Sequence, residues 1–387
     1  MHLSFSPLQI LALCHLTGSA LATFREFGIP PSNATVSIKR FNVANFTAVN
    51  DLHTFVTPIL PGHASAIFPL YSYLVEHGTG ESRRRLMFDL PVGIRKDVLN
   101  FAPAVKVLFT SGDLTGNVSK DITEQLQDGG IELQSIESVI WSHSHFDHIG
   151  DMSKWPNSTS LVIGSETDTS TYPQNVNASL RDSDFAGHNV TKINFSTATL
   201  TFSGLQAIDY FDDGSVYLVN TPGHLPGHLT ALARVTPTSF ILLGGDTFHH
   251  AGEARPRPAF QQAFPCPAHL LEEARSGQSI STDFFWSPKS SLRSFDIPSR
   301  AQQLLSISDL PDRFTADPVE AQVSLEKIAT FDADPDIFVL ISHDLSIVGS
   351  LPYFPQSLDA WKENGWKEET VWNFVDKANP AFVFSPV

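Results

Sequence analysis

Residues 139–148 read VIWSHSHFDH, and this stretch decides how the rest of the chain is interpreted. A short apolar run is followed directly by His143, His145, Asp147 and His148. Imidazole and carboxylate groups are ligands that zinc and similar cations prefer. Alternate side chains of an extended segment point the same way, so the segment can supply ligands to two neighbouring metals. A solvated, histidine-rich loop is the alternative, but this order directly after an apolar strand favours a metal site.

Three further polar clusters also follow apolar runs. The runs 139–141, 216–219, 241–243 and 338–341 are typical of strands covered on both faces, as in a sheet with helices outside it. The clusters behind the last three runs are TPGH at 221–224, GGDT at 244–247 and SHD at 342–344. Layered α/β proteins gather such strand ends at one side, and we therefore expect these polar groups to meet there.

The four motifs together, ending in His148, His224, Asp246 and His343, strongly resemble those of the metallo-β-lactamase superfamily. The resemblance implies an α/β fold, the four-layer αβ/βα sandwich, with a binuclear metal site between the two sheet edges. It implies two zinc ions (Zn2+), although histidine and carboxylate ligands also accept other divalent metals. It assigns His143, His145 and His224 to one metal, Asp147, His148 and His343 to the other, and Asp246 as the bridge.

The resemblance also implies a reaction, in which a metal-bridging hydroxide attacks an acyl carbon. Asp147 would orient the nucleophile and Asp246 would accept or relay a proton. Acyl-homoserine lactonases carry a Tyr three positions after the bridging Asp, where this chain has His249. An imidazole can donate the same hydrogen bond, and we expect either His249 or His250 to contact the substrate.

The ligand set narrows the branch of the superfamily. True β-lactamases lack the bridging Asp246, whereas glyoxalase II and acyl-homoserine lactonases have the full set. We therefore expect a hydrolase that opens small esters, lactones or lactams, of the kind used in secondary metabolism or detoxification. A thioesterase resembling glyoxalase II is the alternative enzyme, and a non-catalytic secreted metal- or ligand-binding protein is the alternative of another class. The substrate's leaving atom stays open at this point.

The first 22 residues have the pattern of a signal peptide. Residues 8–21 form an apolar run too short to span a bilayer, and Ala20 and Ala22 have the spacing required for cleavage. Seven N-glycosylation sequons follow, at Asn33, Asn45, Asn117, Asn157, Asn177, Asn189 and Asn194. Together these features predict a glycoprotein that is secreted or resides in the lumen of the secretory pathway, with Cys266 as its only cysteine after cleavage.

Composition limits the partners. The chain has 387 residues, and its formal net charge of −16 makes nucleic acid a poor partner. No later run is long enough for a membrane span, so we expect a small-molecule acyl substrate, while oligomeric state is not set by the sequence. We expect a single domain over 23–387 with a long insertion at about 250–315.

Local patterns predict several elements. Residues 23–60 are polar and predict an arm or edge strands, and 71–76 with 85–90 predict paired strands. Capping patterns predict helices over 121–128 and 317–329, and 357–364 is a third candidate. His228 is expected beside a metal ligand. Arg255 and Arg257 are expected in a solvated loop, with binding of a substrate carboxylate as the alternative.

Overall fold

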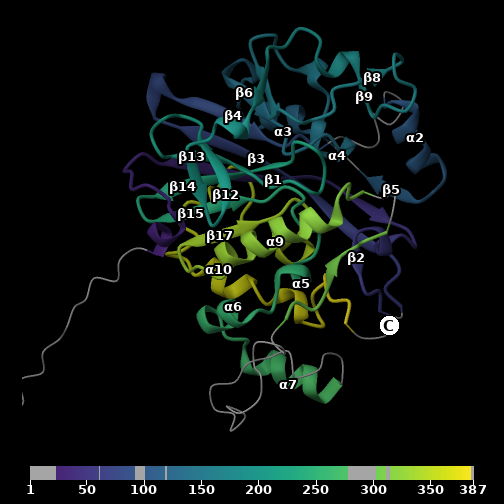
Figure 1. Ribbon diagram of the computed structural model, residues 1–387, viewed down its shortest axis with the longest axis vertical. Coiled ribbons are helices and arrows are strands. Elements are labelled where there is room, and N and C mark those ends of the chain that lie inside the picture. Colours follow the sequence, from purple (N-terminus) through teal and green to yellow (C-terminus); the bar gives the residue numbers. More distant parts are fainter. Residues whose placement is uncertain are drawn as a thin grey trace, which may run out of the picture.

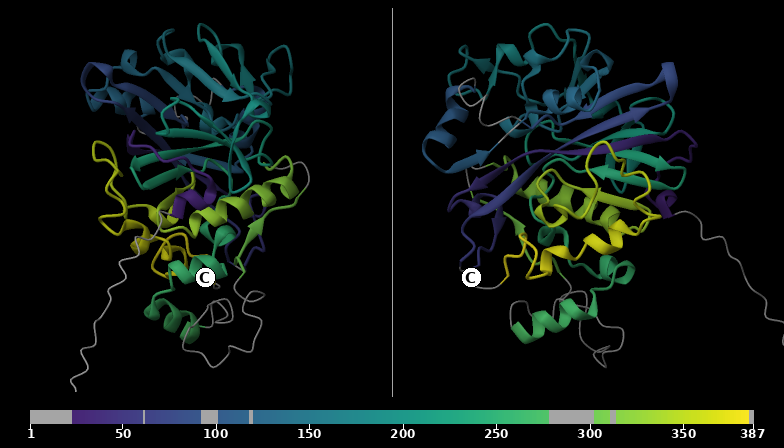
Figure 2. Two further views of the ribbon diagram at one scale, coloured as in Figure 1. Left: turned by 60° about the vertical axis from the view of Figure 1, so that its left-hand side comes forward. Right: turned by 180° about the vertical axis from the view of Figure 1, so that it is seen from behind.

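Two mixed β-sheets lie face to face with helices outside them (Figures 1 and 2). The computed structural model describes residues 23–60, 62–91, 101–117, 120–277, 302–310 and 314–384. The predicted signal peptide, residues 1–22, lies outside the described residues. The arrangement of layers confirms the predicted α/β sandwich.

The first sheet has the strand order β10-β7-β6-β4-β3-β1-β5. Its strands are β1 (Val36–Ala48), β3 (Ala66–His77), β4 (Arg84–Phe88), β5 (Leu114–Asn117), β6 (Ser138–Ile140), β7 (Ser160–Gly164) and β10 (Val190–Ile193). β4, β6, β7 and β10 run parallel to one another, whereas β3, β1 and β5 are antiparallel neighbours. β5 pairs with only the last four residues of β1. β1 is therefore an edge strand along most of its length, as its polar sequence predicts.

The second sheet has the order β11-β12-β13-β14-β15-β17. Its strands are β11 (Leu200–Phe202), β12 (Leu205–Asp209), β13 (Val216–Asn220), β14 (Leu229–Thr236), β15 (Ser239–Leu243) and β17 (Ile337–Leu340). Only β15 and β17 are parallel among these neighbours. Two small pairs complete the strands: β2 (Val56–Thr57) with β16 (Ser306–Ile307), and β8 (Thr171–Tyr172) with β9 (Leu180–Arg181).

The helices flank the sheets or cross their ends. They are α2 (Pro103–Thr110), α3 (Ile122–Asp128), α4 (Phe146–Ile149), α5 (Ala251–Ala254), α6 (Pro258–Ala263), α7 (Ala268–Gly277), α9 (Pro318–Asp332) and α10 (Trp366–Thr370). Short 3-10 helices are η1 (Thr23–Phe27), η2 (Leu52–Thr54), η3 (Gly80–Ser82), η5 (Leu133–Ser135), η6 (Met152–Lys154), η7 (Asp182–Asp184), η8 (Phe195–Thr197), η10 (Leu345–Ile347) and η11 (Asn373–Val375). The helices predicted at 121–128 and 317–329 are confirmed, because Asp121 and Asp317 accept the backbone N–H groups of Glu124 and Glu320 at their starts.

Apolar layers lie between these elements. One joins the facing sides of the two sheets, where residues such as Tyr73 and Ile140 of the first meet Leu218 and Ile241 of the second. Another packs the outer face of the second sheet against α9. A third packs the outer face of the first sheet against α3. The sheet ends are therefore held at fixed positions by burial on both sides.

The helix predicted over 357–364 is wrong. The segment before and within it runs along the free edge of β1 instead. Phe354 N–H donates to Arg40 O and Leu358 N–H donates to Ile38 O, while Ile38 N–H donates to the Asp359 carboxylate. Pairing with an exposed strand edge satisfies backbone groups that a helix would otherwise satisfy, and it covers an edge that would be open to another chain.

The expected solvated loop around Arg255 is also wrong. Arg255 is buried and its guanidinium binds both carboxylate oxygens of Asp332 at 2.7 and 2.8 Å. It also donates to Val371 O, so it ties α5 to α9 and to the segment after α10. Arg257 pairs with Glu326, which also lies on α9 and is more exposed than Asp332. Within the proposed insertion at about 250–315, residues 278–301 and 311–313 lie outside the described part, and the insertion stays a prediction.

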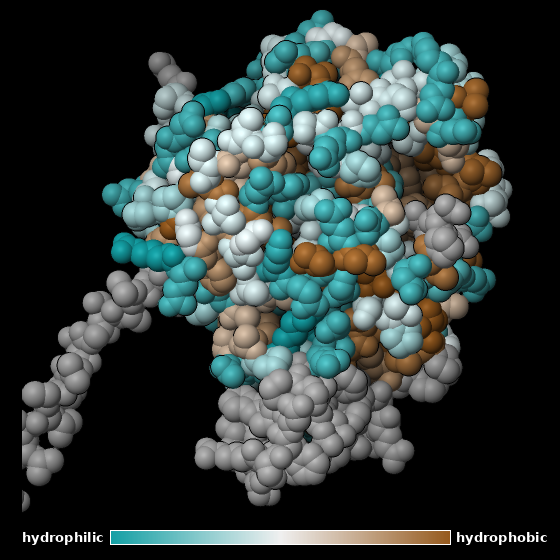
Figure 3. All heavy atoms as spheres, viewed as in Figure 1, coloured by the Kyte–Doolittle hydropathy of each residue, from teal (hydrophilic) through white to brown (hydrophobic). Residues whose placement is uncertain are grey.

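The surface bears on two further expectations. In the described part of the chain, no helix combines the length and the apolar character that crossing a membrane requires. On the face in Figure 3, hydrophilic and hydrophobic side chains are interspersed. The sequon residues Asn45, Asn157, Asn177, Asn189 and Asn194 are exposed. Asn33 is exposed as well, and the side chain of Asn117 lies outside the described part.

Candidate metal centre

All seven predicted metal ligands lie in one cluster between the two sheets. His143 and His145 follow β6, and Asp147 and His148 come from the short helix α4 that begins directly afterwards. From the second sheet, His224 follows β13, Asp246 follows β15 and His343 follows β17. Six of the seven are buried and His145 is half-buried. The structure thus brings together every predicted ligand, while their binding of metal stays a prediction.

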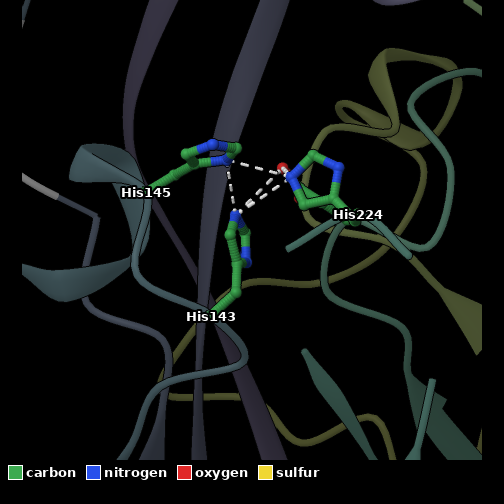
Figure 4. A group of neighbouring side chains, drawn as sticks. His143, His145 and His224 are labelled. Carbon is green, nitrogen blue, oxygen red and sulfur yellow. Dashed lines mark hydrogen bonds and ion pairs between the residues drawn. The ribbon is translucent and has the colours of Figure 1, made fainter. Parts of the chain in front are cut away.

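Three imidazoles of this cluster converge through their ring nitrogens (Figure 4). Nε2 of His143 lies 2.9 Å from Nδ1 of His145, and Nε2 of His224 lies 3.2 and 3.0 Å from these two atoms. A tetrahedral ion with Zn–N bonds of about 2.0–2.1 Å places its ligands about 3.3–3.4 Å apart. The spacing therefore fits three ligands of one small cation.

The other half of the cluster combines a carboxylate with two imidazoles. Oδ2 of Asp147 lies 3.3 Å from Nε2 of His343 and 3.8 Å from Nε2 of His148. These atoms could likewise surround one cation.

Asp246 joins the two halves. Its Oδ2 lies 3.7 and 3.5 Å from the nitrogens of His143 and His224, and 3.2 and 3.3 Å from those of His148 and His343. Its Oδ1 is buried and has no hydrogen-bond partner within the described residues. Because an unsatisfied buried carboxylate oxygen is costly, this atom indicates that a cation belongs beside it.

Electrostatics differ between the two halves. Burial lowers the pKa of His143 and His224 well below the usual value and lowers that of His145 to about 4. These three imidazoles are therefore neutral at pH 7 and have a lone pair to offer a metal.

The second half holds charge. Burial opposes protonation of His148 and His343, but Asp246 and the neighbouring carboxylates outweigh it, so the pKa of His148 is raised well above its usual value and that of His343 to about 10. In turn, these histidines overcome burial and lower the pKa values of Asp147 and Asp246. The carboxylates are thus stabilised by nearby positive charge. Protons on the two histidines supply this charge without a metal, and divalent cations would supply it when bound.

The chain orients several of these ligands through their second ring nitrogen. His148 Nδ1 lies 2.8 Å from the Asp89 carboxylate, and His343 Nδ1 donates to Pro69 O at 2.9 Å. These contacts leave Nε2 of both rings directed at the site, as metal-ligating histidines require. Asp89 also accepts the backbone N–H of Ser142, the residue before the first ligand, at 2.7 Å.

Asp89 was missed by the sequence reasoning. It directly follows β4, within the strand predicted at 85–90, and a carboxylate at a strand end is the one local signal for it, although that signal does not identify its partner. Its φ of +57° is in the left-handed region that favours glycine. Three hydrogen bonds to its carboxylate hold it there, from the Ser142 N–H, the Ser142 hydroxyl and His148.

Two glycines let the ligand loops approach closely. A Cβ on Gly223, before His224, would lie 2.0 Å from the Ala321 nitrogen at the start of α9. A Cβ on Gly245, before Asp246, would lie 2.9 Å from His228 Nε2. His228 itself accepts the Asp246 N–H at 3.1 Å, so it lies beside a ligand as expected.

His249 and His250 point in different directions. His249 Nε2 lies 3.4 Å from Asp246 Oδ2, and its Nδ1 has no hydrogen-bond partner within the described residues. His250 accepts the Gly252 N–H at Nδ1 and donates from Nε2 to Ala381 O at 2.8 Å. His249 therefore faces the predicted metals, whereas His250 holds the C-terminal segment.

Glu253 fixes this pair of histidines. Its Oε2 accepts the backbone N–H groups of both His249 and His250, each at 2.7 Å. The carboxyl is fully buried, and burial raises its pKa to about 8. Glu253 is thus a positioning residue for His249.

Comparisons with known proteins agree with this geometry. The family model described as the metallo-beta-lactamase superfamily matches residues 110–343. A gamma-lactamase of Fusarium pseudograminearum is 31% identical over 370 residues, which are 91% of this chain and 84% of that protein. The metallo-hydrolase mfmC of Annulohypoxylon moriforme is 33% identical over 369 residues, or 92% of this chain and 90% of that protein.

A solved structure has a similar fold. It is a mutant of AiiA from B. thuringiensis, with N-decanoyl-L-homoserine bound at its active site. It aligns with a TM-score of 0.53 at 15% identity and covers 85% of this chain and 100% of that chain. At this identity the likeness establishes a shared fold.

The contact of Asp89 with His148 yields a prediction. Asp89→Asn keeps the size of the side chain but removes the charge that orients the His148 ring, and we expect metal affinity to fall about 10- to 100-fold. Competition with a chromophoric chelator measures this affinity. Asp113→Asn, at an exposed carboxylate outside the site, is the matched control. Equal affinities in the two variants would show that Asp89 does not orient a ligand.

The raised pKa of Glu253 yields a second prediction. A carboxyl with a folded pKa of about 8 and an ordinary unfolded pKa stabilises the fold below about pH 4.5, and this contribution is lost as pH rises through 8. Between pH 5 and pH 8 the loss is on the order of 3 kcal/mol. Glu253→Gln cannot ionise, so we expect the difference in unfolding free energy between variant and wild type to shift in favour of the variant between pH 5 and 8. Urea unfolding at both pH values checks this, and a constant difference would contradict it.

Proposed function

Because this chain belongs to the metallo-β-lactamase superfamily and is a hydrolase related to lactamases and lactonases, we propose that it opens small lactones or lactams with two metal ions held by its seven clustered ligands. The observation that carries the proposal is the position of Asp246, whose Oδ2 lies within 3.7 Å of the nitrogens from both halves of the site. Zinc is the metal we propose, since the ligands are nitrogen and carboxylate atoms at near-tetrahedral spacing.

Two divalent cations in these clusters would lower the pKa of a water and polarise the carbonyl of a bound ester or amide. The residues of the chain provide the remaining requirements. They hold the cations, exclude bulk water, support the carbonyl oxygen and move a proton.

The apolar surroundings of the site strengthen the electrostatic interactions within it. Phe46, Phe55, Phe146 and Phe314 line the narrow space beside Asp147 and Asp246. These rings exclude bulk water, so each charge in the site acts at a lower effective dielectric constant.

His249 is suited to support the carbonyl oxygen. Its ring packs edge-on against Phe55, with centroids 5.2 Å apart, and the Glu253 contact fixes its backbone. An imidazole in this position can donate an N–H to oxygen as negative charge develops there. Asp246, on the other side of the same imidazole, is placed to accept a proton and pass it to the leaving oxygen or nitrogen.

The proposal extends to location. Residues 1–22 have the pattern of a cleavable signal, and six sequon asparagines are exposed. We propose a secreted or luminal glycoprotein on this basis.

The experiment is a panel of γ-butyrolactone, 2-pyrrolidinone and a simple acyl thioester, with metal content determined on the same sample. His145→Ala removes one nitrogen from the first half of the site, and we expect kcat/KM to fall by at least about a hundredfold together with bound metal. His53→Ala, at an exposed imidazole, is the control and should behave as wild type.

The outcomes separate the candidate functions. Lactone or lactam opening lost in His145→Ala supports the proposal and identifies the leaving atom. Thioester cleavage alone would replace it with the thioesterase alternative. Bound metal without turnover of any of the three compounds would contradict it.

A further inference from the structure

A cavity of about 230 Å³ opens beside the metal centre. We call it the side pocket. Its walls include Leu52, Val56, Phe68, Ala381, Phe382 and Val383. These side chains are apolar and come from three regions far apart in the sequence: η2 and β2, the start of β3, and the C-terminal segment.

The side pocket borders the predicted reaction site. His249 and His343 line both the side pocket and the narrow space that contains Asp147 and Asp246. Their rings lie parallel, with centroids 5.9 Å apart. A molecule whose carbonyl lies at the metal centre can therefore place a substituent past these two rings.

The C-terminal segment 380–383 forms one wall of the side pocket, and the fold holds it there. His250 donates to Ala381 O at 2.8 Å, and the Phe384 ring packs against Phe374 with centroids 6.1 Å apart. In Figure 2 this segment, in yellow, returns to the end of the long strands β1 and β3. Adjacent residues thus have separate tasks, since His249 faces the reaction site and His250 fixes the wall.

The size and lining of the side pocket define what it can hold. A dry cavity of about 150 Å³ accepts benzene, so about 230 Å³ accepts an apolar group slightly larger than one benzene ring. A rigid ring also loses less conformational freedom on burial than a flexible chain of equal area. The apolar part of the lining stabilises such a group in proportion to the area removed from water.

We propose that the side pocket selects cyclic esters or amides that carry an aromatic ring, and that the wall 380–383 determines this specificity. The identity of the reacting group rests on the function proposed above, whereas recognition of the ring does not. The test therefore measures both turnover and binding of a hydrocarbon that cannot react.

Val383→Phe tests the wall, because the larger side chain fills the side pocket from a segment near the chain end. Ala66→Phe, which fills it from β3, is a second variant in case the first moves aside. Val319→Phe is the matched control, since Val319 is 77% exposed on α9.

The turnover comparison uses two matched pairs. 2-Coumaranone and oxindole carry a fused benzene ring, and γ-butyrolactone and 2-pyrrolidinone do not. We expect both filling variants to lower the ratio of kcat/KM, bicyclic over monocyclic, by about tenfold or more relative to wild type and Val319→Phe. An unchanged ratio in both filling variants would overturn the proposal.

Binding of indane, followed by ligand-observed NMR, tests the side pocket without any reaction. Indane should bind wild type and Val319→Phe, and its binding should be lost in the filling variants. If wild type binds indane, the filling variants do not, and wild type hydrolyses none of the four compounds, the ring pocket would be supported and the proposed function contradicted. Indane binding that is absent from wild type, or unaffected by filling, would overturn the ring pocket itself.

Discussion

The arrangement of the site depends on one carboxylate oxygen, where side chains from both sheets converge. Oδ2 of Asp246 lies within 3.2 to 3.7 Å of five imidazole nitrogens, from His143, His148, His224, His249 and His343. These histidines come from both sheets, so the convergence can exist only if the ends of β6, β13, β15 and β17 meet. The sandwich achieves this by burying an apolar layer between the sheets, which holds the strand ends in register.

Such a concentration of ionisable groups inside a protein needs opposite charge and fixed geometry. Asp89 and Pro69 O engage the outer nitrogens of His148 and His343, and His228 holds the Asp246 backbone. Without those contacts the rings could rotate and pair among themselves. Because they are held, their remaining nitrogens face one shared volume, which is the arrangement that a pair of cations requires.

The sequence predicts the ligands of the site more completely than it predicts the segments around them. Each ligand directly follows an apolar run, and strand ends meet at one side in layered folds, so the positions of His143, Asp246 and His343 follow from local pattern alone. The helices 121–128 and 317–329 were predictable for the same reason, since their capping residues are local. The resemblance to a known family supplied the order of the layers.

What the sequence did not predict depends on contacts between distant segments. Asp89 is 59 positions from His148, and nothing near it in the chain indicates an imidazole partner. Residues 357–364 have a helical pattern, but the backbone of this segment hydrogen-bonds to the open edge of a strand instead. Arg255 reads as a surface cation, yet Asp332, on another helix, pairs with it in the interior. The wall 380–383 is held by contacts with distant residues, such as the one between Ala381 O and His250.

We propose that two metal ions share the Asp246 carboxylate. A crystal structure of the metal-loaded protein, with anomalous diffraction recorded at the zinc absorption edge, tests it most directly. We predict two anomalous peaks, one among His143, His145 and His224 and one among Asp147, His148 and His343, with the Asp246 carboxylate in contact with both. A single peak, or two peaks without a common contact to Asp246, would contradict the account.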